Sequence, residues 1–303
     1  MDLLRATLRM AAPLLYAALG GAWTQQTGIL NIGQEGAMLL ASFFAILGNY
    51  HLGGWIAGVA CAVAASLAYN LLFGLLCVTL RSNVWVVGMT LNVLADNVVM
   101  ILMKYFFHTK GGFRDPSIVP MPEVSLSFLP DWLDGLSIAV WGAFAVLAVM
   151  LWIDRNTVFG MRLKGAGNNE EALASAGVSP ARMRYRTLLV NGVLVGIAGA
   201  YLSTSYLLAF VSGMSAGRGW IAVAAVIFGD GRLGWTVVGV FLFGLAQAAG
   251  IELQSHGFSS HLTLMLPYLL VIVALVAKQW RLPGRLHAPG RKTPHSGESH
   301  TKR

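Results

Sequence analysis

Charged residues are scarce in this chain of 303 residues, because Asp, Glu, Lys and Arg together make up only 11% of it. Apolar residues make up 56%. A soluble domain has roughly 45–50% apolar and about 25% charged residues, and so few charges cannot cover the surface of a soluble fold of this size. The composition therefore excludes most cytosolic enzymes and compact binding modules, and it indicates a protein with several membrane-spanning helices.

Cysteine and catalytic motifs are also rare or missing. The only cysteines are Cys61 and Cys77, and on one helix they would lie about 24 Å apart, too far for a disulfide. The sequence contains no Walker A motif, no HExxH zinc motif and no serine or cysteine in a nucleophile elbow. We therefore expect no metal, no cofactor and no enzymatic activity on this chain, and any ATP would be hydrolysed by a separate subunit.

Long apolar runs dominate what is present. A membrane span needs about 20 mostly apolar residues. The runs cover residues 55–80, 84–107, 136–153, 188–211, 235–249 and 262–277, with shorter ones at 1–21, 37–49 and 219–228. They predict an all-α, polytopic transmembrane bundle of about eight spans, within a range of about seven to ten, that occupies residues 1–277. The remaining residues 278–303 are basic and polar, and we expect them to be a disordered tail.

The distribution of Lys and Arg predicts how the bundle is oriented. Residues 154–186 hold six basic side chains and the tail holds more, so both should be cytoplasmic. Residues 108–134 are richer in acidic side chains and should face outward. This bias accounts for the net charge of +8. Nucleic-acid binding, which would need a basic patch on a soluble segment, is not expected.

The first fifty residues allow two topologies. Residues 23–36 are polar and rich in glycine, which fits a discontinuous helix, tolerated at membrane depth only where it faces protein or water. With an inside N-terminus, residues 23–50 would dip into the membrane and return on the same side. With an outside N-terminus, two successive segments would both cross. Arg5 and Arg9 favour the inside.

Polar and ionisable residues within this apolar sequence are candidates for a solute pathway, because such a side chain at membrane depth is costly unless it is paired or hydrated. The candidates are Asn31, Gln34, Glu35, Asn92, Asp96 and Asn97. Asn92 and Asp96 are four residues apart and would share a helix face. Two interpretations remain open for the set: the side chains line a water-filled path, or they hydrogen-bond to neighbouring helices and hold the bundle together.

The loop of residues 154–186 is too long for a plain connector. It carries the signals of a short helix, because Asn168 or Asn169 can cap its N-terminus and Glu170 suits its first turn. Gly177 suits the position just after its C-terminus. A short capped helix on a cytoplasmic loop is typical of a docking element.

Three motifs resemble those of permease subunits of ATP-binding-cassette importers for branched-chain amino acids, simple sugars and nucleosides. Residues 27–36 (TGILNIGQEG) are similar to an early membrane signature of that family. Residues 165–177 (GAGNNEEALASAG) resemble its coupling-helix signature. Residues 215–229 (SAGRGWIAVAAVIFG) resemble a run found in its sugar and nucleoside members. Together the motifs keep the family's order and spacing from residue 27 to about residue 250.

The resemblance implies a multi-pass permease of the bacterial cytoplasmic (inner) membrane. Its implied partners are an ATPase subunit that uses ATP and Mg, a second permease subunit that is identical or homologous, and an extracytoplasmic solute-binding protein. The contact with the ATPase would involve Gly167, Asn168, Glu170, Ala172 and Gly177. Two positions depart from the family pattern: Leu173 stands where the coupling signature usually has alanine, and Gln34 stands where an apolar residue is common.

The sequence thus predicts a permease subunit that imports a neutral polar solute, a nucleoside first and a simple sugar second. The alternative is a secondary transporter or channel that acts without ATP and uses Asp96 and Glu35 as ion-coupling groups. An intramembrane enzyme would need a nucleophile or a metal cluster, and neither is found in the sequence.

Overall fold

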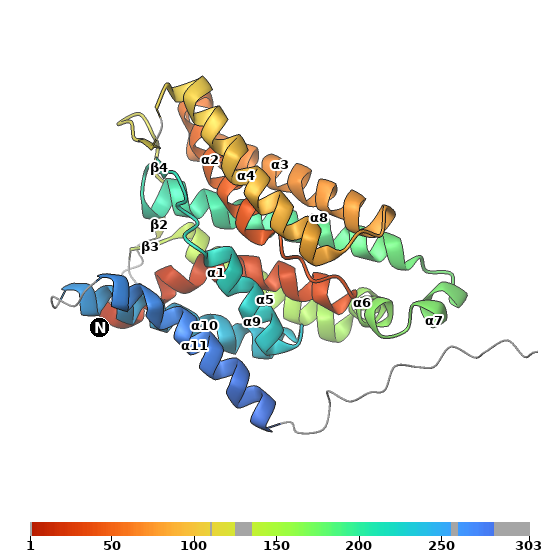
Figure 1. Cartoon of the computed structure of the whole chain (residues 1–303). Coiled ribbons are helices and arrows are strands. Elements are labelled where there is room, and N and C mark those ends of the chain that lie inside the picture. The colour runs from red at the N-terminus through yellow and green to blue at the C-terminus, as the bar shows by residue number, and fades with distance from the viewer. Residues whose placement is uncertain (1, 110, 125–134, 256–259, 282–303) are drawn as a thin grey trace, which may run out of the picture.

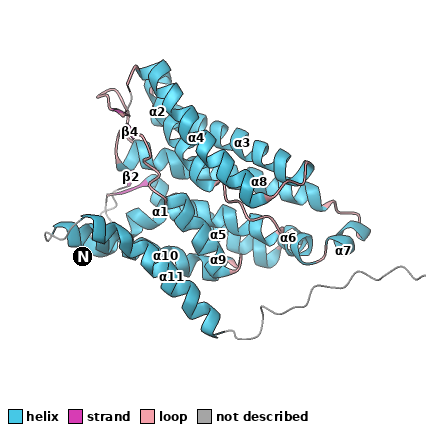
Figure 2. Ribbon diagram, viewed as in Figure 1, coloured by secondary structure: helices cyan, strands magenta, loops and turns pink. Residues whose placement is uncertain are grey.

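The computed structural model describes residues 2–109, 111–124, 135–255 and 260–281, and this part of the chain is mostly helical (Figure 2). The helices are α1 (Asp2–Gln26), α2 (Gln34–Leu52), α3 (Trp55–Gly74), α4 (Val84–Phe107), α5 (Ile138–Asn156), α6 (Val158–Asn168), α7 (Glu170–Ser175), α8 (Pro180–Tyr201), α9 (Arg218–Gly229), α10 (Leu233–Ser255) and α11 (Ser260–Arg281). Two π-helical turns extend α3 and α8, namely η1 (Leu75–Thr79) and η2 (Leu202–Tyr206).

Four strands of two residues each complete the described elements: β1 (Gly112–Phe113), β2 (Glu123–Val124), β3 (Leu136–Ser137) and β4 (Phe210–Val211). β1 pairs antiparallel with β4, and β2 pairs antiparallel with β3. Figure 1 shows these strands and the N-terminus at one end of the bundle and α6 and α7 at the other end. The two ends therefore carry the loops that the charge distribution places on opposite sides of a membrane.

Five segments of the described chain are long and apolar enough to cross a membrane: Trp55–Thr79, Val84–Phe107, Ile138–Asn156, Pro180–Tyr206 and Leu233–Gln254. The prediction of a helical protein with several membrane spans is thereby confirmed. The count of about eight spans stays a prediction, because among the described residues α1, α2, α9 and α11 do not meet the same criterion. α11 continues to Arg281, so residues 278–281 are helical, whereas residues 282–303 of the predicted tail lie outside the described residues.

The helices form two groups that meet along α1, α2 and α8. In Figure 1, α3 and α4 lie beside α2 on one side of this seam. On the other side α5, α9 and α10 lie beside α1, and α11 packs against α9 and α10. Glycines allow the close approach of α8 to its neighbours. A Cβ atom at Gly196 would lie 2.6 Å from Val63 Cα on α3, and one at Gly199 would lie 2.6 Å from the Met38 carbonyl oxygen on α2. Small residues thus give the interface backbone-to-backbone contact.

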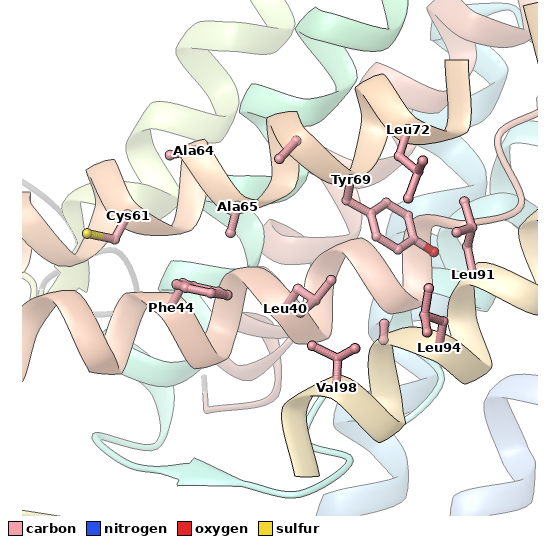
Figure 3. Close-up of a pocket in the computed structure, with 12 residues that line it drawn as sticks. Leu40, Phe44, Cys61, Ala64, Ala65, Tyr69, Leu72, Leu91, Leu94 and Val98 are labelled. Carbon is pink, nitrogen blue, oxygen red and sulfur yellow. The ribbon is translucent and has the colours of Figure 1, made fainter. Parts of the chain in front are cut away.

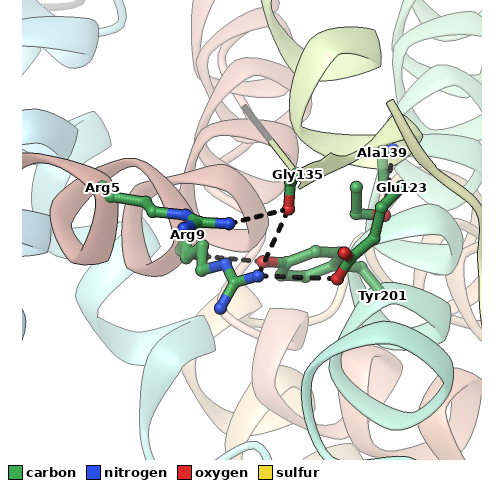
Figure 4. Close-up of polar contacts among 7 residues, drawn as sticks. Arg5, Arg9, Glu123, Gly135, Ala139 and Tyr201 are labelled. Atoms are coloured by element: carbon green, nitrogen blue, oxygen red, sulfur yellow. Dashed lines mark hydrogen bonds and ion pairs between the residues drawn. The ribbon is translucent and has the colours of Figure 1, made fainter. Parts of the chain in front are cut away.

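The N-terminal end of α1 lies beside Glu123 and Gly135 (Figure 4). Arg5 and Arg9 donate to the Gly135 carbonyl oxygen at 3.3 and 3.4 Å, and Arg9 forms an ion pair with Glu123 at 3.5 Å. Pro13 has no backbone N–H to offer the Arg9 carbonyl. The Tyr201 hydroxyl donates to that carbonyl instead, at 3.2 Å. The start of α1 is therefore held at the end of the bundle that lies opposite α6 and α7.

Of the two topologies that the sequence allows, the structure matches the one in which both early segments run from one side to the other. α2 returns to the side of residues 108–134, where Asn49 donates to the Val119 carbonyl at 2.8 Å. The expectation from Arg5 and Arg9, that the N-terminus shares a side with the loop of residues 154–186, is wrong, because these arginines lie at the opposite end of the bundle from α6 and α7. Arg5 and Arg9 are bound to the Gly135 carbonyl and, through Arg9, to the Glu123 carboxylate. Their positive charge therefore does not indicate on which side of the membrane the N-terminus lies.

Candidate functional site

Residues 27–33 interrupt the helices at the first motif, within the stretch predicted as a discontinuous helix. The Thr27 hydroxyl donates to the Thr24 carbonyl at 2.8 Å, which helps to satisfy the carbonyl groups at the buried C-terminal end of α1. Gly28 follows with a φ of +84°, a backbone conformation that residues other than glycine rarely adopt. The sequence thus ends α1 and turns the chain before α2 begins.

A cluster of buried amides anchors this break to α3 and α8. Asn31 and Asn191 both donate to Asn70 Oδ1, at 2.8 and 3.0 Å, and Asn70 donates to the Ser66 carbonyl at 2.8 Å. Asn31 Oδ1 accepts from the backbone N–H of Gly33 at 3.0 Å. All three asparagines are fully buried. The amide of Asn31 is therefore used within the bundle.

Asn92 anchors the break to α4 through further buried hydrogen bonds. Its Oδ1 accepts from the Gly36 backbone N–H at 2.8 Å and from the Tyr69 hydroxyl at 3.0 Å. Its Nδ2 donates to the Ile32 carbonyl at 3.0 Å. The side chain fixes α4 against the first turn of α2, and its hydrogen-bonding atoms are all engaged.

Glu35 joins the first motif to the third. Its two carboxylate oxygens accept from the backbone N–H groups of Gly217 and Gly219, at 2.8 and 2.7 Å. These N–H groups lie at the start of α9, where the helix dipole favours a negative charge. At 1.5 Å per residue α9 spans about 18 Å, well short of the roughly 30 Å of a bilayer core. The two discontinuous helices α2 and α9 therefore meet, N-terminus to N-terminus, inside the bundle.

The remaining predicted pathway residues fall into two places. Gln34 lies at the break, is 1% exposed and packs against Gly21 of α1. Asp96 and Asn97 lie on the exposed side of α4, where Asn97 Nδ2 donates to the Val93 carbonyl at 2.7 Å. The structure thus brings four of the six residues together at the break and separates the other two from it.

An apolar cavity of about 450 Å³ lies between α2, α3 and α4 (Figure 3). Leu40, Phe44 and Leu94 line it, and its polar side chain Tyr69 donates its hydroxyl to Asn92. A polar solute would therefore lose its hydrogen bonds with water here and gain none.

A second cavity, of about 310 Å³, has a different lining. It lies among α1, α9, α10 and α11 and includes Arg218, Gln247, Gln254 and Tyr268. Sequence reasoning missed these residues. A signal was present, because Arg218 is the only charged residue between Arg186 and Asp230.

A third cavity, of about 1000 Å³, lies at the end of the bundle that carries α6 and α7. Gln26 and Gly28 of the break line it together with Gly167 and Asn168, two residues of the predicted ATPase contact. A Cβ atom at Gly167 would collide with the Gln26 carbonyl oxygen, so α6 lies directly on the end of α1.

Arg184 makes a further connection between the long loop and the break. Its Nε donates to the Thr27 carbonyl at 3.1 Å, and its guanidinium forms an ion pair with Glu170 at the start of α7. The first and second motifs, far apart in the sequence, therefore touch at one end of the bundle.

The short helix predicted in the loop is present as α7. Asn169 caps it by accepting from the Ala172 backbone N–H at 3.1 Å, whereas Asn168 is the last residue of α6. Gly177 follows with a φ of +78°. No residue of α7 is buried, so the helix projects from the bundle. Its role as the contact with an ATPase stays a prediction.

Broken helices that meet inside an apolar bundle are typical of membrane transport proteins. The chain belongs to the family described as branched-chain amino acid transport system / permease component, whose family model matches residues 3–275. The family identified from the three motifs is therefore confirmed. In the described residues, no group of three or more His, Cys, Asp or Glu is placed to hold a metal ion.

Relatives of the chain carry names from the same kind of transporter. It is 32% identical, over 84% of its own length and 78% of the relative's, to a Haloferax volcanii protein named for glucose transport, the ABC transporter permease TsgC13. It is 28% identical to the guanosine ABC transporter permease protein NupQ of Bacillus subtilis, over 94% of this chain and 92% of that protein. It is 27% identical to the nucleoside ABC transporter permease protein NupC of Lactococcus lactis, over 88% of each. No solved structure matches the chain.

Proposed function

We propose that this chain is the membrane-spanning permease subunit of an ATP-driven importer that carries a nucleoside or a simple sugar. The names of its relatives, which specify guanosine, nucleosides and glucose, support this class of neutral polar solute. The observation that carries the proposal is the contact between the exposed loop and the broken helix. Gly167 and Arg184 of the loop lie against Gln26 and Thr27 at the start of the break.

This contact offers a route from ATP hydrolysis to the solute path. An ATPase subunit that holds α7 would move the loop, and Arg184 would carry the movement to the break. The break is bound through Glu35 to the start of α9, so α2 and α9 would move together. The covalent connections of the loop to α5 and α8 would tilt those helices as well.

The partners follow from the same proposal. A separate ATPase subunit binds ATP and Mg and contacts the side of α6 and α7. A second permease, identical or homologous, completes the path through the bacterial cytoplasmic membrane. This chain crosses that membrane seven or nine times, the odd numbers within the predicted range of about seven to ten, because its N-terminus and its tail lie on opposite sides. An extracytoplasmic solute-binding protein delivers the solute to the side of residues 108–134, and the loop of residues 154–186 and the tail are cytoplasmic.

The structure weighs against the alternative of an ATP-independent transporter that uses Glu35 and Asp96. Both oxygens of Glu35 accept backbone N–H groups at the start of α9, so the carboxylate is engaged within the bundle. Asp96 lies apart from it on the exposed side of α4.

Purification of the tagged chain in mild detergent, with mass spectrometry of the subunits that copurify, tests the proposal. We expect an ATPase and a second permease, and the reconstituted complex should take up guanosine or glucose only when ATP is supplied. The variant Asn168→Ala should assemble normally but show reduced uptake and reduced solute-stimulated ATP hydrolysis. A chain that purifies alone and moves solute without ATP would refute the importer, and normal uptake by Asn168→Ala would refute the assigned contact.

A further inference from the structure

The cavity of about 310 Å³ among α1, α9, α10 and α11 has a size and a lining suited to a small polar ring. Its volume is at the lower end of the range of ligand pockets, about 300–1,000 Å³. The polar residues in its wall come from the start of α9, the outer half of α10 and the first turns of α11. They are Arg218, Gln247, Gln254, Thr263 and Tyr268.

Arg218 contributes a hydrogen-bond donor that the described residues leave without a partner. Its Nη1 donates to the carbonyl oxygens of Met214 and Ser215, at 3.1 and 3.4 Å, and its guanidinium lies 5.9 Å from the centre of the Tyr206 ring. Its Nε is buried and accepted by no atom of the described chain. A buried donor without an acceptor is costly, and a ligand that accepts from it recovers that free energy.

Gln247 contributes the complementary acceptor. Its Oε1 is also buried and receives no hydrogen bond from the part of the chain that the structure describes. The neighbouring Gln254 differs, because its Nε2 donates to the Thr263 hydroxyl at 2.7 Å. One cavity is therefore lined by a cationic side chain with one unmatched donor, Arg218 Nε, and by an amide side chain with one unmatched acceptor, Gln247 Oε1.

Tyr268 adds an aromatic face beside this pair. It is 46% exposed, and its hydroxyl lies 3.5 Å from the Ala216 carbonyl at the start of α9. A flat ring stacks on such a side chain with little dependence on its substituents. A nucleobase with a lactam edge, where a C=O group adjoins an N–H group, matches all three side chains. Its C=O group can accept from the guanidinium, its N–H group can donate to the amide, and its flat face can stack on the phenol ring.

We propose that this cavity binds the transported solute by the lactam edge of a nucleobase, with Arg218 donating to the C=O group and Gln247 accepting from the N–H group. The proposal rests on the importer function above and selects a nucleoside over a simple sugar. A sugar has hydroxyl groups but no flat ring edge on which a carbonyl and an N–H lie side by side.

Uptake by the complete ATPase-containing complex in proteoliposomes tests the assignment, with guanosine and purine riboside as the two probes. Purine riboside has the same ring and ribose but lacks the lactam edge. The variant Gln247→Leu keeps the side-chain volume and removes the acceptor. It should raise the KM for guanosine roughly 5- to 30-fold, the effect of one lost hydrogen bond, and reduce the preference for guanosine over purine riboside by a similar factor.

Leu245→Ala is the matched control, because Leu245 lies on the same helix with an exposed side chain outside the cavity. It should retain the wild-type KM and preference. Arg218→Lys keeps the charge but loses the planar donor set, and it should reduce the same preference. Thermal unfolding of each complex separates lost recognition from lost folding.

The outcomes separate this proposal from the function on which it rests. If the wild-type complex takes up guanosine and Gln247→Leu leaves both the KM and the preference unchanged, the cavity assignment is overturned and the importer function stands. If ATP drives uptake of glucose but of neither nucleoside, the importer stands and the lactam site is again overturned. If the wild-type complex takes up no solute with ATP, both proposals fail.

Discussion

Two buried polar regions of this permease contain the same kind of group in different surroundings. At the helix break, Asn191 Oδ1 and Gln34 Oε1 have no partner among the described residues, and Gly20 and Gly21 of α1 pack directly against these side chains. Beside α9, the unmatched atoms belong to Arg218 and Gln247, two side chains that line a cavity. An unmatched atom in a packed interface costs stability and can bind nothing, whereas a side chain that lines a cavity has room to turn such an atom toward a ligand.

The two regions meet where the start of α9 packs on the start of α2. A substitution that separates these two helices should lower the stability of the protein more than any other change considered below. A Cβ atom at Gly219 would lie 2.5 Å from both the Cα and the N of Glu35, so Gly219→Ala must separate α9 from α2. We expect a loss of about 1–3 kcal/mol or more in stability, seen as a thermal midpoint several degrees lower and a reduced yield of monodisperse protein.

Gly234→Ala is the control for Gly219→Ala, because the structure places nothing within 4 Å of a Cβ atom at Gly234. It should retain the wild-type midpoint. Equal behaviour of the two variants would show that α9 does not dock on α2 through Gly219.

Breaking the amide cluster should have the next largest effect. Asn70→Ala removes the acceptor of both Asn31 and Asn191 and leaves two buried donors unmatched. We expect a loss of about 1–3 kcal/mol, measured as a lower thermal midpoint in detergent. Asn97→Ala, which removes an exposed side chain bonded only to its own helix, should change the midpoint little. A cluster that tolerates Asn70→Ala would have no role in holding the break.

The smallest effect on stability is expected for Gln34→Leu, which tests most directly whether the two polar regions differ. Gln34→Leu removes an unmatched polar atom from a packed site and keeps the volume, so the thermal midpoint should stay the same or rise slightly. The KM for guanosine and the preference over purine riboside should not change. A loss of that preference would place Gln34 on the solute path and erase the distinction between the two regions.

Local features of this chain could be predicted from its sequence, and contacts between distant segments could not. The sequence predicts a break in a helix within residues 23–36 and a short helix that Asn168 or Asn169 begins and Gly177 ends, because glycine and capping residues act over a few positions. The pairing of Glu35 with the start of α9 joins residues about 180 positions apart. No periodicity reports which helix a polar side chain will meet.

The face shared by Asn92 and Asp96 shows the same limit. Residues four apart on a helix differ by about 40° in direction, and the boundary of the packed face of α4 runs between these two. Asn92 is 7% exposed and bonded to α2 and α3, whereas Asp96 is exposed. Spacing gives the relative direction of two side chains, and the position of the neighbouring helix decides which of them is buried.

α1 connects the two ends of the bundle. One continuous helix links Arg9, which binds Glu123 at one surface of the protein, to Gln26, which lies under Gly167 at the opposite surface. In the importer proposed above, a delivery protein that pressed on the first surface would act on the same helix that carries Gln26 at the other end. The arrival of the solute would then reach the ATPase subunit through α1, before the solute itself had moved.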